Sequence, residues 1–476
     1  MRLLDRLQAL VGPAGLVTDA AAQAPYLTDW LGKWTGRATV VVRPADTAET
    51  AAVVRLCSET RTPIVTQGGN TGMSGGATPD ASGAQVVLST TRMNRVRDID
   101  PVNNTLTLDA GVILAHAQDA ARSVDRFFPL SLGAQGSCTV GGNVATNAGG
   151  IAVLRYGNTR ELVLGLEVVL PDGRVWHGLR ALRKDNTGYD LKGLFIGSEG
   201  TLGVITAVVL KLFPRPTSHA TAWVGADSLE QLVALLGAMR TRCGERLTAF
   251  EMMTAPSLRM VLDHVADTRA PLERPAPFNA LIELGDTGSE TETETGTAAA
   301  GPAALLEAAL ADAMDAGLVV DAMLSTSEAQ TLALWKLREG VSQAQVRAGR
   351  AVKHDIALPI SSLATFVAQA EIQVQACLPG ARIVNFGHLG DGNLHYNVLL
   401  PLDTDRAVLE RRTHELNAVV HALVTRHGGS ISAEHGIGQL RRDELRIYKS
   451  PVEIELMLRI KQAMDPNQIM NPGKLL

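Results

Sequence analysis

Two long glycine-rich segments constrain this chain more than any other feature of its sequence. The first, QGGNTGMSGGATP, covers residues 67–79 and continues directly from the strand-like run TPIVT. The second, PLSLGAQGSCTVGGNVATNAGG, covers residues 129–150. Glycine allows positive φ and a close approach of backbone to ligand, and successive N–H groups can form a cradle for an anion. The two segments therefore predict loops shaped around a pyrophosphate.

The familiar nucleotide motifs do not explain these segments. Neither contains G-x-G-x-x-G, and Gly436-Ile437-Gly438, which begins such a motif, lacks the third glycine. A P-loop is excluded because no G-K-[ST] occurs. Either segment alone could equally be a turn in a β-rich domain, since glycine is the default turn residue. Two such segments in one region, each with Asn, Thr or Ser beside the glycines, favour a dinucleotide site.

The order of the predicted elements indicates an α+β chain with more than one domain. The 476 residues suggest two or three domains. Residues 38–66 are predicted as strand, helix and strand, and Pro171-Asp172-Gly173 is predicted as the turn of a hairpin. From about residue 218 the pattern becomes an alternation of strands and helices. Between the predicted strand FNALIELG and the predicted helix LLEAALADAMDAG, residues 286–302 are acidic and Thr-rich. We interpret them as a mobile surface loop without an assigned function.

Composition excludes several classes of protein. The net charge is −5 and no basic block occurs, which argues against a nucleic-acid partner. The four cysteines are far apart, so a zinc ribbon, an iron–sulfur cluster or a disulfide framework is not expected. The N-terminus is amphipathic with an acid inside it, unlike a signal peptide, and no apolar run is long enough to span a membrane. We expect a cytoplasmic bacterial protein, with peripheral membrane association left open.

The stretch NFGHLGDGNLHYNV, residues 385–398, concentrates polar side chains in an apolar frame. Two strand-like runs flank Gly390-Asp391-Gly392-Asn393, a strong turn signal, so we expect a β-hairpin. His395 and Asn397 are two residues apart on one strand and share a face. His388 on the partner strand can point to the same side. Two neutral imidazoles on adjacent strands are the beginning of a divalent-metal site.

A metal site needs a third ligand, and SISAEHGIG supplies Glu434 just after a predicted strand. His435 follows and is expected to point elsewhere. A lone histidine is more often a packed or surface residue than a ligand. That interpretation is given to the remaining histidines, namely His116, His177, His219, His264, His354, His414, His421 and His427.

Five stretches together resemble a known family. They are TQGGNTGMSGG, PLSLGAQGSCTVGGNVATNAGG, RYGNTRELVLGLEVVLPDG, LKGLFIGSEGTLGVIT and the terminal MDPNQIMNPGK. In this order, over nearly the whole chain, they resemble the FAD-linked oxidoreductases of the vanillyl-alcohol oxidase superfamily. Within it they are most similar to the D-2-hydroxyacid dehydrogenases, which include D-2-hydroxyglutarate and D-lactate dehydrogenases.

The resemblance implies a domain plan. A PCMH-type (p-cresol methylhydroxylase-type) FAD-binding domain with two subdomains would cover residues 1–217. An α+β substrate- and metal-binding domain with an antiparallel sheet would cover 218–440. A C-terminal helical segment, 441–476, would return to the FAD domain. The active site would lie where the two domains meet.

The resemblance also implies FAD and the residues that hold it. The pyrophosphate would be held by Gly68, Gly69, Asn70, Thr71 and Gly72. The rest of the cofactor would be lined by Pro129, Leu130, Gly133, Ser137, Gly141, Gly142, Asn143, Thr146 and Gly150. The adenine end would contact Gly200 and Ile205, and the flavin would be reached from the tail by Asn471.

The bond between protein and flavin is expected to be non-covalent. Some members of the superfamily carry, in the first loop, a histidine that bonds covalently to the flavin. Asn70 stands at the position that resembles it, and an asparagine cannot form that bond. Cys138 is the nearby residue that could attach the flavin instead, but a small packed residue is the better interpretation.

In the resembling dehydrogenases His388, His395 and Glu434 correspond to the metal ligands, commonly for zinc. Asn397 and His435 correspond to a substrate contact and to the catalytic base, with His435 also at the substrate. Three further positions bind substrate, and their counterparts here are Arg338, Ser342 and Lys353. An Arg can hold a carboxylate through two hydrogen bonds, and a Lys adds a point charge.

The predicted helix around residues 328–349 puts Arg338 and Ser342 on one side, since they are four residues apart. One departure affects the substrate. The position of Ser342 is typically Thr in D-2-hydroxyglutarate enzymes, which puts the exact substrate in doubt.

These residues lead to a functional hypothesis. The chain would oxidise a D-2-hydroxy acid, D-2-hydroxyglutarate as first choice, to the 2-oxo acid. The metal would make the hydroxyl acidic, His435 would take its proton, and a hydride would pass to the flavin. Two alternatives stay open: D-lactate or another small D-2-hydroxy acid as substrate, and a non-catalytic flavin-binding subunit. An alkyl-ether-phosphate synthase or a berberine-type oxidase is disfavoured by the hairpin histidines with Glu434.

The expected partners follow from the same hypothesis. They are the small 2-hydroxy acid itself and an electron acceptor such as an electron-transfer flavoprotein, a quinone or a cytochrome. A homodimer is a further expectation, whereas nucleic acid is not expected.

Overall fold

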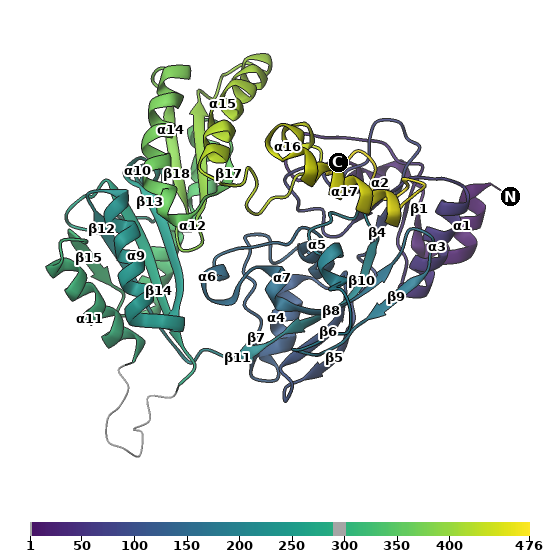
Figure 1. Cartoon of the computed structure of the whole chain (residues 1–476), viewed down its shortest axis with the longest axis horizontal. Helices are drawn as coiled ribbons and strands as arrows, with labels where there is room; N and C mark the ends of the chain where they lie inside the picture. The colour runs from purple at the N-terminus through teal and green to yellow at the C-terminus, as the bar shows by residue number, and fades with distance from the viewer. Residues whose placement is uncertain (1, 289–300) are drawn as a thin grey trace. The chain divides into compact units, whose positions relative to one another are not determined.

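The computed structural model describes residues 2–288 and 301–476 (Figure 1). It divides into two compact units. The first combines Met1–Gly150, Tyr156–Arg215 and Glu434–Leu476, and the second combines Ile151–Arg155 and Pro216–Ala433. Most of the loop expected at 286–302, namely residues 289–300, lies outside the described residues.

The first unit contains a four-stranded, mostly parallel sheet. Its order is β1 (Leu16–Val17), β2 (Val40–Val42), β4 (Val86–Ser89) and β3 (Ile64–Gln67), and β1 alone is antiparallel to its neighbour. The all-valine strand β2 is buried, as is typical of a parallel strand covered on both faces. Helices α1 (Leu3–Val11) and α3 (Thr47–Glu59) contribute to the same core, and α2 (Ala20–Leu27) follows β1. Strand β3 ends at Gln67, so it leads directly into the first glycine-rich loop.

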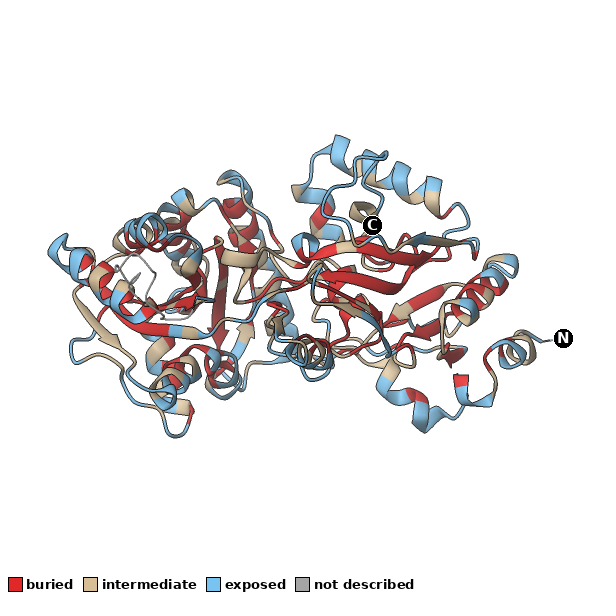
Figure 2. Cartoon of the chain, turned by 90° about the horizontal axis from the view of Figure 1, so that it is seen from below, coloured by how far each residue is buried: buried red, intermediate tan, exposed pale blue. Residues whose placement is uncertain are grey.

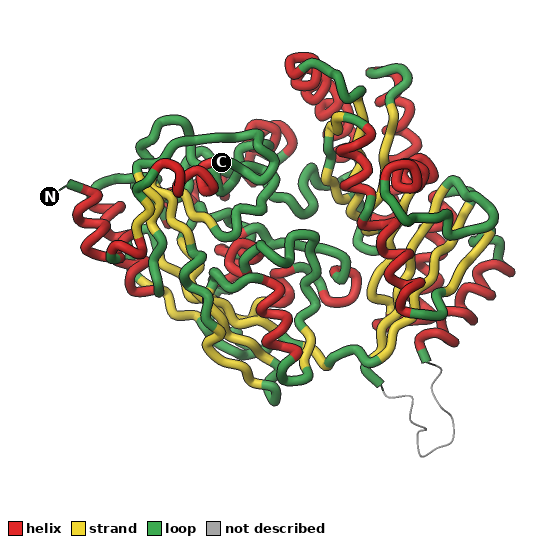
Figure 3. The backbone as a smooth tube through the Cα atoms, turned by 180° about the vertical axis from the view of Figure 1, so that it is seen from behind, coloured by secondary structure: helices red, strands yellow, loops and turns green. Residues whose placement is uncertain are grey.

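A second, antiparallel sheet completes the first unit (Figure 3). Its order is β5 (Val96–Asp100), β6 (Thr105–Asp109), β10 (Val204–Lys211), β8 (Val163–Val169) and β9 (Val175–Gly178). The hairpin predicted around Pro171-Asp172-Gly173 is confirmed by the pairing of β8 with β9. A two-stranded sheet joins β7 (Arg126–Phe127) to β11 (Phe213–Pro214). The short helices of this region are α4 (Leu114–Arg122), α5 (Val140–Ala145), α7 (Thr159–Leu162) and α8 (Lys192–Phe195), whereas α6 (Val153–Tyr156) lies mostly in the second unit.

The end of the chain packs onto the first sheet. After α16 (Arg442–Tyr448) and α17 (Pro451–Met464), the tail runs beside β3, where Ile64 N–H donates to Ile469 O at 2.7 Å. The N–H of Asn471 donates in turn to Ile64 O at 2.7 Å. Figure 1 shows this yellow segment beside the purple strands of the N-terminal region. The tail is therefore part of the first unit.

The second unit is built on one large antiparallel sheet. Its order is β15 (Asp321–Leu324), β12 (Ser218–Ala226), β14 (Phe278–Asp286), β13 (Leu247–Thr254), β18 (Arg382–His388), β19 (Asn393–Leu400) and β16 (Arg350–Val352). The short strand β17 (Asp355–Ala357) also pairs with β19. The predicted hairpin of residues 385–398 is confirmed, with Phe386 opposite His395. Figure 2 shows the strands largely buried and the outer helices largely exposed.

Helices cover this sheet. One apolar cluster joins α10 (Ala255–His264), α12 (Glu328–Glu339) and α13 (Val341–Ala348) to the side chains of Trp223, Met253, Leu281 and Phe386. The other helices of the unit are α9 (Leu229–Cys243), α11 (Pro302–Asp315), α14 (Leu363–Cys377) and α15 (Arg406–Arg426). In the apolar cluster, Phe386 marks the sheet face on which His388 and His395 also lie, because residues directly opposite or two apart share a face.

Three sequence predictions need correction. The single helix expected over 328–349 is two helices, α12 and α13, which meet at Gly340. The strand expected before Glu434 is reduced to one isolated bridge between Ser430 and Ala357. The second glycine-rich segment is more than turns, because it contains helix α5, which begins after Thr139. The Thr139 hydroxyl accepts the N–H of Gly142 and so starts a helix in a sequence of low helix propensity.

Candidate active site

A cavity in the first unit is formed by both glycine-rich segments. Its empty space is ≈ 920 Å³ including the mouth. Its walls come from five stretches of chain: β3 with the loop after it, Thr90 after β4, the segment around α5, the turn into β10, and His435. The residues predicted for FAD that line it are Gly68, Gly69, Asn70, Thr71, Gly72, Gly141, Gly142, Asn143, Thr146, Gly200 and Ile205.

Six predicted cofactor residues do not line this cavity: Pro129, Leu130, Gly133, Ser137, Gly150 and Asn471. Asn471 nevertheless supports its wall, because its Nδ2 donates to Gly76 O at 3.0 Å and to Glu199 O at 2.7 Å. Both of those residues line the cavity. Gly150 contacts the side chain of Glu434 instead, which its N–H reaches at 2.8 Å.

The walls suit a dinucleotide. Gly68 and Gly69 lie so close to the Ser137–Thr139 segment that a Cβ on either would overlap Thr139 Oγ1 or Ser137 O. Glycine is therefore required for the two loops to meet. Thr66 Oγ1, on the wall of the cavity, is buried without a hydrogen-bond partner, so it can bond a ligand there. The glycine loops and the unsatisfied hydroxyl fit the polar groups of FAD.

Asn70 and Cys138 are both occupied within the protein. Asn70 has φ 53° and donates from Nδ2 to the carbonyls of Pro25 and Thr28, at 3.0 and 2.9 Å. Cys138 is buried and accepts a hydrogen bond from Asn143 Nδ2 at 3.6 Å. Burial raises the pKa of the Cys138 thiol, against the lowering effect of Asn143, so the neutral thiol is favoured over the reactive thiolate.

Sequence reasoning missed Glu199, which fixes the loop that carries His435. Its two carboxylate oxygens accept the N–H groups of Ile437 and Gly438, at 2.8 and 2.7 Å. Loss of solvent around Glu199 raises the pKa of this carboxyl, while the two N–H groups oppose the shift. Ser74 Oγ adds a bond to the main-chain oxygen of His435 at 3.0 Å. The sequence offered one indication of a role for Glu199, namely its position next to Gly200, a predicted cofactor residue. Its hydrogen-bond partners, Ile437 and Gly438, are too distant in sequence to be predicted.

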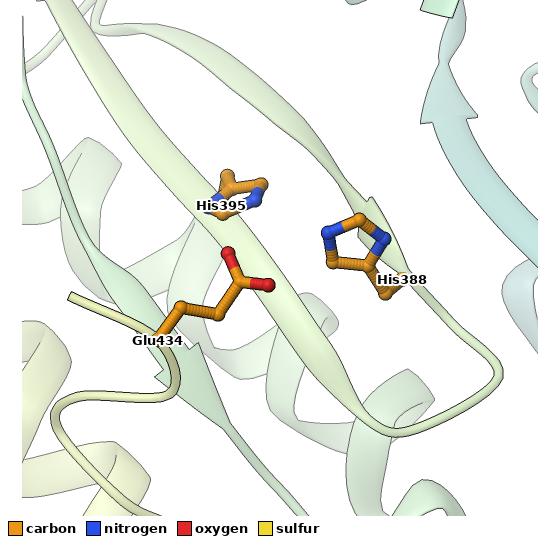
Figure 4. A group of neighbouring side chains, drawn as sticks. All are labelled: His388, His395 and Glu434. Atoms are coloured by element: carbon orange, nitrogen blue, oxygen red, sulfur yellow. The ribbon is translucent and has the colours of Figure 1, made fainter. Parts of the chain in front are cut away.

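His388, His395 and Glu434 lie together (Figure 4). Each offers one ligand atom, and these atoms all lie within 4.8 Å of one another. His388 comes from β18, His395 from β19, and Glu434 directly follows Ala433, whose N–H donates to Asp355 O at 3.2 Å. Two imidazoles and a carboxylate are a donor set that suits zinc and other divalent first-row metals.

A carboxylate lies close to the Nδ1 atom of each of the two imidazoles. Glu251 Oε1 lies 2.6 Å from His388 Nδ1, and Asp355 Oδ1 lies 3.8 Å from His395 Nδ1. Burial alone would raise the pKa of Glu251, but His388 and Arg338 together lower it, so the carboxylate is charged. A carboxylate at hydrogen-bond distance, as Glu251 is from His388, orients a metal-binding histidine, whereas the 3.8 Å between Asp355 and His395 is an ion-pair distance only. Neither Glu251 nor Asp355 was identified from the sequence; a carboxylate inside the apolar strand AFEMM was the available signal for Glu251.

The predicted substrate residues of the second unit differ in exposure. Arg338 is 9% exposed and pairs with Glu251, whereas Ser342 on α13 and Lys353 between β16 and β17 are exposed. Asn397 is buried: its Oδ1 accepts the N–H of His354 at 3.1 Å and its Nδ2 donates to Gln345 Oε1 at 2.9 Å. An amide can form four hydrogen bonds, so Asn397 retains one donor and one acceptor position.

Solved structures share this fold. The chain aligns over 99% of its length with p-cresol methylhydroxylase (96% of that chain, TM-score 0.75, 17% identity). It aligns over the same share with an alkyldihydroxyacetonephosphate synthase (86% of that chain, TM-score 0.73, 16% identity). At such identities the likeness shows the fold alone, and it confirms the expected α+β class with a PCMH-type FAD-binding domain. Fold and cavity thus define a protein with a PCMH-type FAD-binding domain.

The family follows from the sequence matches. Residues 215–475 match the model for the C-terminal domain of FAD-linked oxidases, and residues 38–178 match the model for an FAD-binding domain. The chain belongs to the FAD-linked oxidase family.

Relatives of this chain cover nearly all of it and confirm the resemblance. A mitochondrial D-2-hydroxyglutarate dehydrogenase of Bos taurus is 41% identical over 99% of this chain and 83% of its own length. A D-2-hydroxyglutarate dehydrogenase of Xanthomonas citri pv. viticola is 39% identical over 98% of this chain and 96% of its own. A Schizosaccharomyces pombe relative, 38% identical over 96% of this chain and 85% of its own, is named provisionally as a mitochondrial D-lactate dehydrogenase.

No helix in the described part of the chain has the length and apolar character needed to cross a bilayer.

Proposed function

We propose that the chain oxidises D-2-hydroxyglutarate to the corresponding 2-oxo acid, with non-covalent FAD and a divalent metal, zinc as first choice. The observation that carries the proposal is the cluster of His388, His395 and Glu434, together with the cavity-lining His435 one peptide bond further on. One proposed ligand, Glu434, is thereby joined by a peptide bond to a potential base on the wall of the cofactor cavity. Relatives named for this substrate, about 40% identical over nearly the whole chain, support the choice of substrate.

When bound, FAD would supply a two-electron acceptor, and the divalent cation would supply a Lewis acid for the substrate hydroxyl. The protein's own residues would do the rest. His435 would accept the hydroxyl proton on its imidazole, a contribution of roughly 10²–10⁴-fold in rate. Arg338 and Lys353 would bind carboxylate oxygens, and the remaining amide positions of Asn397 would orient the substrate. Ser342 would add a hydroxyl at the rim.

The non-covalent flavin is supported by the two residues at the relevant positions. Asn70 has no group that could bond to the flavin, and the Cys138 thiol is favoured in its neutral form. Denaturation of the yellow protein should release all its FAD into the supernatant. Flavin absorbance that stays with the precipitated chain would contradict this part of the proposal.

A second substrate, D-lactate, is favoured by one observation. Arg338 already forms an ion pair with Glu251, with Nη2 2.7 Å from Oε2, so only part of its guanidinium remains for a substrate. A monocarboxylate needs fewer donors than a dicarboxylate. The provisionally named D-lactate dehydrogenase among the relatives agrees with this candidate.

The test is a substrate panel with an artificial electron acceptor. It should contain both enantiomers of 2-hydroxyglutarate and lactate, assayed with the metal-replete holoenzyme. We expect the highest kcat/KM for D-2-hydroxyglutarate and a clear preference for D over L. Equal values for D-lactate would remove the dicarboxylate assignment, and no turnover of any 2-hydroxy acid would refute the proposed function as a whole. Lys353→Met should raise the KM for the dicarboxylate more than for lactate if Lys353 binds the distal carboxylate.

A further inference from the structure

One buried carboxylate in the second unit contacts both parts of the proposed site. Glu251 lies on β13 directly opposite His388 on β18, and it is 1% exposed. Its Oε1 lies 2.6 Å from His388 Nδ1. Its Oε2 accepts from Arg338 Nε at 2.8 Å and lies 2.7 Å from Nη2. Each oxygen therefore serves a different partner, one a candidate metal ligand and the other a candidate carboxylate-binding residue.

The contact with His388 fixes which ring nitrogen can bind a metal. A charged carboxylate can only accept hydrogen bonds, so His388 must carry its proton on Nδ1. Nε2 then holds the lone pair and is the ligand atom. A histidine fixed in this way is oriented and made more basic before the metal arrives.

The contact with Arg338 fixes which edge of the guanidinium can bind a substrate. Glu251 occupies Nε and one side of Nη2. The guanidinium carbon lies 4.9 Å from the centroid of the Phe386 ring, which supports the group on one face. Because Glu251 takes one edge and Phe386 one face, the Nη1 edge is the one left for a bidentate contact with a carboxylate.

We propose that Glu251 is a positioning residue that sets both His388 for the metal and Arg338 for the substrate carboxylate, so that the two binding functions depend on one side chain. This inference rests on the proposed function. It predicts that metal affinity and substrate KM change together when Glu251 is altered. A carboxylate that only held the core together would affect stability without changing either.

The test compares Glu251→Gln with Glu283→Gln in the FAD-loaded protein. Gln keeps the shape of Glu, but its amide offers a donor where one partner needs an acceptor. Glu283 is a matched control on the adjacent strand β14: it accepts Trp335 Nε1 on α12 at 3.0 Å and Thr248 Oγ1 at 3.1 Å. Chelator-treated protein is titrated with Zn²⁺ against a chromophoric competitor, and KM is measured at saturating Zn²⁺.

For Glu251→Gln we expect Zn²⁺ affinity to fall by roughly 10–100-fold, with a KM for the 2-hydroxy acid that rises at saturating Zn²⁺. Glu283→Gln should stay within about twofold of wild type in both measurements, because it contacts neither His388 nor Arg338. Unchanged Zn²⁺ affinity in Glu251→Gln would overturn the role toward His388. An unchanged KM at saturating Zn²⁺ would overturn the coupling.

A second variant keeps the proposal testable if Glu251→Gln does not fold. Arg338→Lys leaves His388 bonded to Glu251, so Zn²⁺ affinity should stay within about threefold while KM rises. An unchanged KM would overturn the role of the held guanidinium edge. Failure of the proposed function itself would be seen in the wild type, as absence of Zn²⁺ binding or of 2-hydroxy acid oxidation, before any variant is compared.

Discussion

The carboxylate of Glu199 accepts the main-chain N–H of Gly438 at 2.7 Å, across 239 residues of sequence. Its other oxygen accepts the N–H of Ile437 at 2.8 Å. In Glu199→Gln one of these N–H groups would face an amide donor, and hydrogen bonds to charged groups contribute about 1.5–3 kcal/mol. We expect faster hydrogen exchange at Ile437 and Gly438 and a lower kcat, since His435 precedes them. The exposed Glu59→Gln serves as the control, and equal exchange in both variants would contradict the role of Glu199.

Gly438 should not tolerate a side chain. Its φ is 53°, and a Cβ there would overlap Ser74 O. Gly428, at the end of α15, has φ 71° but nothing within 4 Å of its Cβ position. Gly428→Ala should lower the free energy of unfolding by about 1–2 kcal/mol, the cost of a side chain in the left-handed backbone conformation. Gly438→Ala should lower it further, because the new Cβ would also overlap Ser74 O, and it should displace His435. Activity assays and thermal unfolding of the two variants test this. Equal losses of stability and activity would show that the structure accommodates the Cβ of residue 438 without a steric penalty.

The Cys138 thiol should resist alkylation at neutral pH. Its pKa is raised above the usual 9.0 by burial. The thiolate is the nucleophile, so the alkylation rate should keep rising with pH beyond 9, where a free cysteine has begun to level off. Cys57, whose pKa is raised to about 12, should react still more slowly. Peptide mapping after iodoacetamide treatment measures both, and FAD should protect Cys138 because it lines the cavity. Rapid reaction at pH 7 would refute the neutral thiol.

Removal of the metal should separate turnover from flavin binding. None of the three proposed ligands lines the cofactor cavity. Chelation should therefore abolish oxidation of the 2-hydroxy acid while leaving the absorbance spectrum of bound FAD unchanged, and Zn²⁺ should restore it. His395→Ala should mimic chelation, whereas His116→Ala, at an exposed position of α4, should not. Full activity after verified metal loss would remove the metal from the proposal.

Lys461 should be required to hold the C-terminal tail. Its Nζ donates to Thr201 O at 2.7 Å, to Met470 O at 2.8 Å and to the buried Asp465 at 2.6 Å. Lys461→Met leaves that carboxylate unpaired, for which about 3–5 kcal/mol is typical. Lys449→Met should change stability far less, because its ion pair with Glu453 is exposed and exposed pairs contribute little. Hydrogen exchange at Ile64 and Asn471, whose amides bond across the tail and β3, reports on tail release. Equal protection in both variants would contradict the prediction.

Local patterns were sufficient for much of the fold. The turn residues Gly390-Asp391-Gly392 favour a tight reversal of the chain between two apolar runs, and the structure has the hairpin where it was predicted. The two-residue spacing of His395 and Asn397 fixed their common face without any knowledge of the rest of the chain. Where a local signal was weak, prediction was wrong: Gly340 divides one expected helix, and the residues before Glu434 form a single bridge.

The partners within the site could not be predicted in this way. Glu251 and Glu199 act on residues 137 and 239 positions away, and no local rule links a buried carboxylate to a specific distant donor. The hairpin pattern and the resemblance together identified His388, His395 and Glu434 as a candidate set, but not the residues that hold them in position. The burial of Arg338 and the exposure of Ser342 could not be predicted from the sequence either, because both depend on how α12 and α13 pack on the sheet.

The boundary between the two compact units falls between Ala433 and Glu434. Cleavage of this bond would leave His388 and His395 in residues 1–433, together with both glycine-rich segments, and would separate them from Glu434 and His435 in residues 434–476. Neither fragment alone would contain all three proposed metal ligands. Under the proposed function, the peptide bond between Glu434 and His435 would tie one metal ligand directly to the proton acceptor.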